Sequence, residues 1–306
     1  MAKEHNFVSA AVYLHNDEAR IGTFLDYLTG LLDARFEKYE IICVNDASTD
    51  NTAERVRAFA REHDFPLTLV QMSAWHGLEP AMNAAIDAAI GDFVFEFDTP
   101  ERSWPEALPT DCYRKALEGF DIVWACPDKR SRGLRGLFYR VFNRSADTIY
   151  PVREDDFRLV SRRALNRVHA ISGVPFYRKA AYAASGLRLA CVDFAPVCRP
   201  VRHTKDLSDK ALDALALYTD MGYRLCAGIS LALLALCLIF GIYTVAVYLG
   251  PVHQVTGWTS TMLVLCVGFF GVFLVLTLVI KYLSLLVELL FKKQRYLIEG
   301  IEKLQK

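Results

Sequence analysis

The stretch Gly91-Asp-Phe-Val-Phe-Glu-Phe-Asp-Thr-Pro100 contains an apolar run that ends in two closely spaced acids. Residues 93–97 are rich in aromatic and β-branched types, which predicts a strand buried on both faces of a parallel sheet. Because side chains alternate along a strand, Glu96 and Asp98 project to the same side at its carboxyl end. Ligands of open α/β sheets bind outside that edge, and two converging carboxylates suit a divalent cation that also binds phosphates. The alternative is a strand end whose two acids are merely solvated.

Strand and helix patterns alternate along the chain on either side of this run. The expected strands are residues 7–13, 39–44, 67–71 and 120–125, and the expected helices are residues 17–32, those after Asn51, 78–90 and those from Ser103. Asn51 with Glu54 has the pattern of a capping box, and Ser103-Trp-Pro-Glu106 has the residues of a helix start. This alternation predicts an α/β fold with a doubly wound, mostly parallel sheet and right-handed crossovers.

Composition limits the class of protein. The 306 residues leave room for one α/β domain of about 200 residues and something smaller. The 35 basic and 35 acidic residues balance, so no nucleic-acid-binding surface is indicated. The eight cysteines include no Cys-x-x-Cys pair and are interpreted as buried thiols in a reducing compartment. Residues 1–6 lack the pattern of a signal peptide, so we expect the first domain in the cytoplasm.

Two long apolar runs follow in the C-terminal third. Leu225–Leu249 has 25 residues without a charge and Trp258–Ile280 has 23, each long enough to cross a bilayer as a helix. The connector 250–257 carries no Lys or Arg. Basic residues flank the pair on its outer sides: Arg224, Lys281, Lys292, Lys293 and Arg295. The positive-inside rule then predicts a hairpin of two transmembrane helices with both flanks in the cytoplasm.

These patterns predict four parts of the chain. We expect a cytoplasmic catalytic domain at 1–207, a juxtamembrane amphipathic helix at 208–224, a transmembrane hairpin at 225–291 and a cytoplasmic tail at 292–306. On this interpretation the amphipathic helix lies in the headgroup plane. An ordinary packing helix is the alternative.

A polar loop follows the expected strand at 39–44. In the segment Asn45-Asp-Ala-Ser-Thr-Asp-Asn-Thr52, Asp46 comes directly after the strand, at the same sheet edge as Asp98. The loop opens a helix, whose free N–H groups suit a nucleotide or its phosphates. We interpret Ser48 and Asp50 as residues that cap and turn the chain, and Asp46 as a functional acid.

Several spaced motifs together resemble glycosyltransferase family 2. They are Val12-Tyr13 with Asn16–Glu18, Val44–Thr52, His76-Gly77 with Ala81, Ala85 and Ala89–Asp92, and then Glu96–Asp98. Leu137–Asn143 and Asp155–Arg163 are similar to the second half of its polyprenyl-phosphate branch. That branch contains dolichol-phosphate mannose synthases and bacterial polyprenyl-phosphate glucosyl- and aminoarabinosyl-transferases. The resemblance covers about residues 7–290 and implies a GT-A-type sheet with a C-terminal membrane hairpin.

The resemblance assigns a nucleotide site. Asp46 matches the acid that contacts the base or ribose, and Tyr13, His76 and Glu96 are expected beside the nucleotide. For His76, a turn histidine that hydrogen-bonds its own loop is the alternative interpretation.

The resemblance also assigns the groups around the reacting sugar. Asp98, with Glu96, matches the acid pair that holds Mg²⁺ or Mn²⁺ against the donor's diphosphate. Asp156 and Arg158 match the segment that faces the sugar and the acceptor phosphate, so we expect catalytic roles for Asp98, Asp156 and Arg158. A cation there would act as a Lewis acid on the leaving diphosphate.

The sequence departs from the family pattern at several positions. Asn45 and Glu96 each replace an acid, and Thr99-Pro100 replaces the Leu-Gln that often follows the acid pair. Glu101 is an alternative partner for the metal. Leu78-Glu79-Pro80 stands where a basic residue is common. These changes leave the donor's identity open.

Basic residues form two further clusters. The segment 129–135 contains Arg132 and Arg135, and Arg202 lies in a second cluster before residue 208. These three arginines are candidates for contacts to the acceptor phosphate or to anionic headgroups. A flexible, solvated loop is the alternative for 129–135.

The sequence therefore predicts a metal-dependent, inverting glycosyltransferase anchored in the inner membrane. It would move a sugar from a nucleotide-sugar donor to a polyprenyl phosphate at the cytoplasmic face, as a step in building the cell envelope. Tetramers occur in the resembled branch, so a homo-tetramer is one expectation. The alternatives are transfer to another membrane acceptor, such as a glycolipid or polysaccharide, and a catalytically silent nucleotide-binding scaffold.

Overall fold

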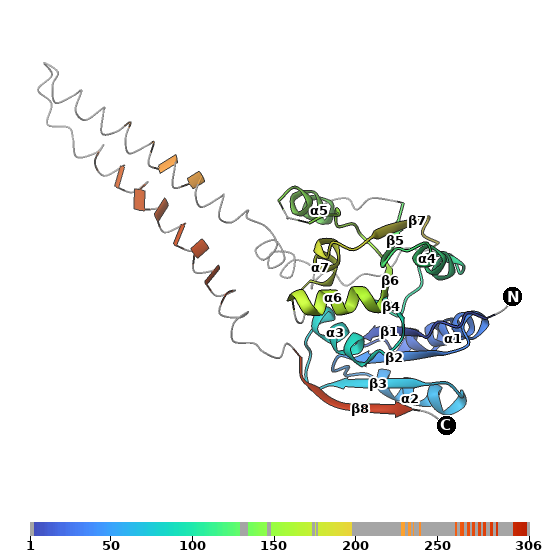
Figure 1. Ribbon diagram of the computed structural model, residues 1–306. Coiled ribbons are helices and arrows are strands. Elements are labelled where there is room, and N and C mark those ends of the chain that lie inside the picture. The colour runs from blue at the N-terminus through green and yellow to red at the C-terminus, as the bar shows by residue number, and fades with distance from the viewer. Residues whose placement is uncertain are drawn as a thin grey trace, which may run out of the picture. The chain divides into compact units, whose positions relative to one another are not determined.

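The computed structural model describes residues 3–128, 134–145, 148–172, 175, 177–197 and 296–304, together with scattered positions between 228 and 286. The chain divides into two compact units. The first unit comprises residues 1–208 and 294–306, and the second comprises residues 209–293. The sheet and the helices that cover it belong to the first unit (Figure 1).

One eight-stranded sheet organises the first unit, in the order β7-β5-β6-β4-β1-β2-β3-β8 (Figure 1). The strands are β1 (Val8–Leu14), β2 (Tyr39–Asn45), β3 (Leu67–Met72), β4 (Phe93–Phe97), β5 (Ile122–Pro127), β6 (Phe157–Ser161), β7 (Leu189–Phe194) and β8 (Ile298–Leu304). Strand β6 runs antiparallel to β4 and β5, and β8 runs antiparallel to β3, while the other pairs are parallel. The prediction of a mostly parallel α/β sheet is confirmed.

Helices cover both faces of this sheet (Figure 1). The described helices of the first unit are α1 (Glu18–Arg35), α2 (Thr52–Glu62), α3 (Leu78–Ala88), α4 (Leu108–Leu117), α5 (Leu134–Ser145), α6 (Arg162–Ser172) and α7 (Arg178–Ala184). The main apolar core joins α1, α2 and α4 to one face of the sheet. In α1 the apolar residues recur at helix spacing, and Ile21, Phe24, Leu25 and Leu28 are all buried in this core. Helices α3, α6 and α7 lie on the other face, where the polar site is found (Figure 1).

Most of the sequence-predicted elements begin and end within two or three residues of the observed ones, and β4 matches residues 93–97. Two local predictions are wrong. Helix α4 begins at Leu108 rather than near Ser103, whose hydroxyl instead donates a hydrogen bond to Asp156. Helix α2 does follow Asn51, but the Asn51 side chain makes no capping bond and donates to Glu18. In both places a tertiary partner outcompetes the local capping pattern.

The C-terminal part gave one unexpected strand. Residues 298–304, expected within a tail, form β8 and extend the sheet beyond β3. The expected amphipathic helix at 208–224 and the connector 250–257 lie outside the described residues, as do most positions of the two apolar runs. Within the described part of the chain, no helix combines the length and the apolar character needed to span a membrane.

Gly91 offers a test of the close packing between β4 and β1. A Cβ atom at Gly91 would lie 2.6 Å from the Ser9 amide nitrogen and 2.9 Å from the Phe7 carbonyl oxygen, both backbone atoms. We expect Gly91→Ala to lower the free energy of unfolding by about 1–3 kcal/mol, as overpacking does. Gly22→Ala is the matched control, because nothing lies within 4 Å of its Cβ and alanine favours the interior of α1. Urea unfolding measures both, and equal stability of the two variants would contradict the packing.

Candidate active site

The first polar group of the site surrounds Asp46, directly after β2. Its fully buried carboxylate accepts hydrogen bonds from the Tyr13 hydroxyl (3.0 Å), the His76 amide (2.8 Å) and the Gly77 amide (2.7 Å). Gly77 has φ 82°, a left-handed conformation that glycine adopts without strain and that turns its N–H toward the acid. The structure therefore brings together Tyr13, Asp46 and His76, three residues that the sequence predicts at the nucleotide.

The His76 ring is engaged within the protein. Its Nε2 accepts a hydrogen bond from the Leu297 amide at 3.1 Å, so the ring proton belongs on Nδ1, which donates to the Ala74 carbonyl at 2.5 Å. His76 thus bonds to its own loop, as the alternative interpretation predicts, and it faces Asp46 through its backbone N–H.

Ser48 and Asp50 have the structural roles predicted for them. The Ser48 hydroxyl donates to Asn45 at 2.5 Å and accepts from the Asn16 amide at 3.0 Å. Asp50 accepts from the amides of Glu18 and Thr52 at 3.1 and 3.0 Å. These bonds tie the start of α1 to the loop that carries Asp46.

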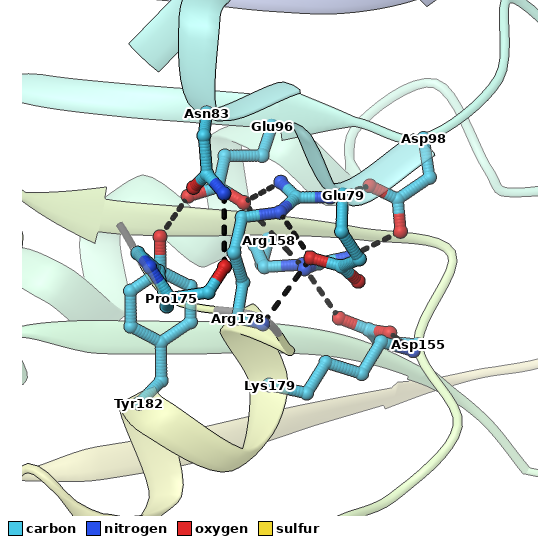
Figure 2. Close-up of polar contacts among 10 residues, drawn as sticks. All are labelled: Glu79, Asn83, Glu96, Asp98, Asp155, Arg158, Pro175, Arg178, Lys179 and Tyr182. Carbon is cyan, nitrogen blue, oxygen red and sulfur yellow. Dashed lines mark hydrogen bonds and ion pairs between the residues drawn. The ribbon is translucent and has the colours of Figure 1, made fainter. Parts of the chain in front are cut away.

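The second polar group is a buried charge network on β4, β6, α3 and α7 (Figure 2). Glu96 lies opposite Arg158 in the β4–β6 register. Arg178, the first residue of α7, reaches Glu96 at 2.5 Å and Asp98 at 2.9 Å, and Arg158 also pairs with Asp98. Both guanidinium groups are fully buried. Each carboxylate of the acid pair is therefore held by two arginines.

Further residues complete this network (Figure 2). Glu79, on α3, accepts from the Arg178 side chain at 2.8 Å and from its amide at 3.2 Å. Asp155 pairs with Arg158 Nε at 3.0 Å and with Lys179. The Tyr182 hydroxyl donates to Glu96. Acids and bases thus alternate through the network, which is how buried charges are accommodated.

The two acids of the pair differ in their electrostatics. Burial raises the pKa of Glu96, even though Arg178 and Arg158 oppose the effect. Burial would also raise the pKa of Asp98, but the combined attraction of Arg158, Arg178 and Lys179 outweighs it and holds that pKa well below its usual range. The two arginines therefore favour the ionised form of Asp98.

Asp98 fits a divalent cation better than Glu96 does. The Asp98 side chain remains 18% exposed, whereas Glu96 is fully buried. The oxygens of both acids are bonded within the protein, those of Glu96 by Arg178 and Tyr182 and those of Asp98 by Arg158 and Arg178, so exposure is what distinguishes Asp98. No cluster of three or more His, Cys, Asp or Glu placed to hold a metal occurs among the residues that the structure describes. One carboxylate is compatible with Mg²⁺, which takes its remaining ligands from phosphates and water. Glu101 pairs with Arg20 at 3.7 Å, and its role as a ligand stays a prediction.

Asp156 lies beside the charge network, at the start of β6. Its buried carboxylate accepts a hydrogen bond from the Ser103 hydroxyl, and Ser103 belongs to the segment that follows Asp98. Burial raises the pKa of Asp156, a shift that the Ser103 bond partly offsets. A carboxylate with a raised pKa is suited to accept a proton.

The predicted phosphate contacts are the least described part of the site. Arg132 and Arg202 lie outside the described residues. Arg135 lies in the first turn of α5. Their contacts to an acceptor stay predictions.

Sequence reasoning missed two cations of the network, Arg178 and Lys179, and it missed Glu79, which pairs with Arg178. A signal was present. In α7, Arg178-Lys179 precede Ala-Ala-Tyr-Ala-Ala184, a short helix of small and apolar residues, and cations on such a helix require buried acidic partners.

Several known proteins resemble this chain in sequence. The model of the family described as "Glycosyl transferase family 2" matches residues 9–183. An undecaprenyl-phosphate 4-deoxy-4-formamido-L-arabinose transferase of Aeromonas hydrophila is 26% identical, over 51% of this chain and 48% of that protein. A prophage bactoprenol glucosyl transferase homolog of Escherichia coli is 24% identical, over 78% of this chain and 80% of its own length.

Among solved structures, a mannosyltransferase from Pyrobaculum calidifontis has the same fold. It superposes with a TM-score of 0.52 at 20% identity, over 95% of this chain and 88% of that one. Its structure was solved with GDP-mannose and Mn²⁺. At this identity the likeness establishes a GT-A-like α/β fold and no more.

Arg178 is expected to be critical for stability. Replacing it with Gln removes the buried ion pairs that Arg178 makes with Glu79, Glu96 and Asp98, which costs about 3–5 kcal/mol of unfolding free energy. The control is Arg163→Gln on the surface, whose 70% exposed side chain pairs with Asp121 and should contribute much less than Arg178 does. Chemical denaturation measures both losses, and comparable losses would show that the network is not a stabilising constraint.

Proposed function

Because the chain belongs to glycosyl transferase family 2, we propose that it transfers a sugar from a nucleotide-sugar donor to a polyprenyl phosphate. The observation that carries this proposal is the position of Asp98. It is the partly exposed acid of the pair, it is held ionised by two buried arginines, and it follows β4 at the sheet edge where Asp46 follows β2. Ligands of open α/β sheets bind at that edge.

The acceptor class is inferred from the relatives. Undecaprenyl phosphate and bactoprenol appear in the names of the two relatives described above. The first of them is covered over only 48% of its length, so its substrate is carried to this chain as a proposal.

Each acid then has a separate task in the proposed reaction. Asp46, which binds the amides of His76 and Gly77, would form the part of the edge that faces the nucleotide. Asp98 would hold Mg²⁺ or Mn²⁺, and the ion supplies positive charge for the leaving nucleoside diphosphate. Arg158 and Arg178 keep Asp98 ionised and oriented. Glu96 binds Arg178 and would not contact the ligand.

Asp156 is proposed to orient the acceptor phosphate and to take a proton from it when it arrives protonated. A phosphate oxygen then attacks the anomeric carbon as the bond to the diphosphate breaks, so the configuration inverts. A polyprenyl phosphate is already anionic at neutral pH, so positioning contributes more than a strong base would.

We further propose that the two apolar runs anchor the protein in the inner membrane, with the first unit and both termini in the cytoplasm. The length of each run and the basic flanks support this. Several large apolar side chains in the second run lie at helical positions and remain about half exposed, namely Leu265, Phe269, Val272, Leu276 and Val279. Such a surface suits lipid or another apolar partner. A homo-tetramer stays a proposal.

The direct test is a donor screen with undecaprenyl phosphate and mass detection of the glycolipid. Wild-type protein should yield one sugar-phospholipid, and Asp98→Asn should reduce its formation by at least about 10²-fold, because the carboxylate that would hold the cation against the diphosphate is lost. Asp64→Asn is the control, since Asp64 is exposed in the loop between α2 and β3. That loop leads into the amino end of β3, whereas Asp98 follows the carboxyl end of β4. Nucleotide binding without turnover on any donor would favour a silent scaffold, and transfer to a glycolipid or polysaccharide would redefine the acceptor.

The Ser103 hydroxyl provides a test of the role of Asp156. Its hydrogen bond favours the ionised carboxylate, so Ser103→Ala should raise the pKa of Asp156 further. At a given acidic pH less of the carboxylate is then ionised, and the acidic limb of the pH–rate profile should move to higher pH. The alkaline limb should not move. An acidic limb that is unchanged or displaced to lower pH would contradict a proton-accepting or phosphate-orienting role for Asp156.

A further inference from the structure

The C-terminal segment of the first unit contacts the loop that holds Asp46. Just before β8, the Leu297 carbonyl accepts hydrogen bonds from the Ser73 amide (3.0 Å) and hydroxyl (3.2 Å). The Leu297 amide donates to His76 Nε2 at 3.1 Å. The Tyr296 hydroxyl donates to Asp87 on α3, the helix that this loop opens. Residues 296–297 thus bind both ends of the segment 73–76.

These contacts continue to the acid itself. The His76 amide donates to Asp46 Oδ1 at 2.8 Å, and the Gly77 amide donates to Oδ2 at 2.7 Å. The His76 ring bonds to Leu297 through Nε2 and to Ala74 through Nδ1, so its orientation is set from both sides. A short path of hydrogen bonds therefore runs from Leu297 through His76 to Asp46.

The same segment contributes little to the apolar core. Leu297 is 58% exposed, and Ile298 and Ile301 in β8 are 38% and 52% exposed. Strand β8 is held by its ladder with β3 and by the ion pair of Glu302 with Arg57, at 2.7 and 2.8 Å. Elements with few buried apolar contacts lie at the low end of local stability. The specific contacts of residues 296–297 are with the loop and with α3 rather than with the core.

We propose that Leu297, acting through His76, is a positioning residue of the donor site: the C-terminal segment holds the loop 73–77 in the geometry that aims two backbone amides at Asp46. This inference rests on the proposed function, in which that loop faces the nucleotide. It assigns a role to residues that follow both apolar runs in the chain. The donor site is then complete only when residues 296–304 are paired with β3.

Two substitutions in the full-length chain interrupt the path at different points. Leu297→Pro removes the amide that donates to His76, and His76→Phe retains a ring but removes both nitrogens. His76→Gln is the conservative rescue, because its amide oxygen can accept from Leu297. Arg57→Gln is the matched control: it removes the partner of Glu302 further along β8 and leaves the loop contacts intact.

Binding is measured by titration calorimetry with UDP, GDP, ADP and CDP in the presence of Mn²⁺, and by kcat and KM with the donor found in the screen. Loss of one net hydrogen bond predicts a three- to tenfold rise in Kd and donor KM for Leu297→Pro and His76→Phe, with kcat within about twofold. His76→Gln should recover most of the affinity, and Arg57→Gln should bind as wild type does.

Hydrogen exchange gives a readout that needs no ligand. In Leu297→Pro the amides of His76 and Gly77 should exchange faster, while amides in β1 and β2 keep their protection. The positioning role is rejected if both variants bind the nucleotide as tightly as wild type, if Arg57→Gln weakens binding equally, or if protection is lost throughout the sheet. If wild-type protein binds none of the four nucleotides, the proposed function fails and the inference fails with it. Tight binding that the variants leave unchanged overturns the inference alone.

Discussion

The positive charges of two fully buried arginines must be paired with acids, and the rest of the first unit depends on this constraint. Arg158 and Arg178 have no access to solvent, and an unpaired charge in that position would cost several kcal/mol. Their partners come from different elements: Glu79 from α3, Glu96 from β4, Asp98 from directly after β4, and Asp155 from the segment before β6. Satisfying the two guanidinium groups therefore requires α3, β4, β6 and α7 to meet in one arrangement. Asp98 is oriented as a consequence of that requirement (Figure 2).

The three acids at this sheet edge have different surroundings, and these surroundings suit each acid to a different chemical role. Asp46 is surrounded by neutral donors, namely a tyrosine hydroxyl and two backbone amides. Asp98 is surrounded by cations, which hold its pKa low, whereas burial raises the pKa of Asp156. Groups whose pKa values are pushed apart in this way can act as a permanent anion and as a proton acceptor in the same site. This division agrees with a transfer in which one acid serves the diphosphate and another serves the acceptor.

How far the sequence predicted this arrangement depends on whether each signal is local. Strand β4 was predicted to the residue because five consecutive positions in a buried parallel strand must be largely apolar. Asp46 and Asp98 were found because parallel strands end at a common edge. The helix start at Ser103 was wrong because its hydroxyl bonds to Asp156, which is 53 positions away in the sequence. Arg178 was missed for the same reason, since it lies 82 positions from Glu96 and no local pattern links the two.

The pairing of β8 with β3 has two effects: it covers the edge of the sheet, and it brings Leu297 to the loop around Asp46. Without it, β3 would be an open edge with unpaired backbone groups, a liability that proteins cover or charge. The segment Ile298-Glu-Gly-Ile-Glu-Lys-Leu304 covers that edge and presents Glu299, Glu302 and Lys303 on the new one. The antiparallel register that covers β3 also brings Leu297 level with Ser73, and so within reach of His76. Because residues 297–304 come after both apolar runs, neither the sheet edge nor the loop around Asp46 can be completed before those runs have been synthesised.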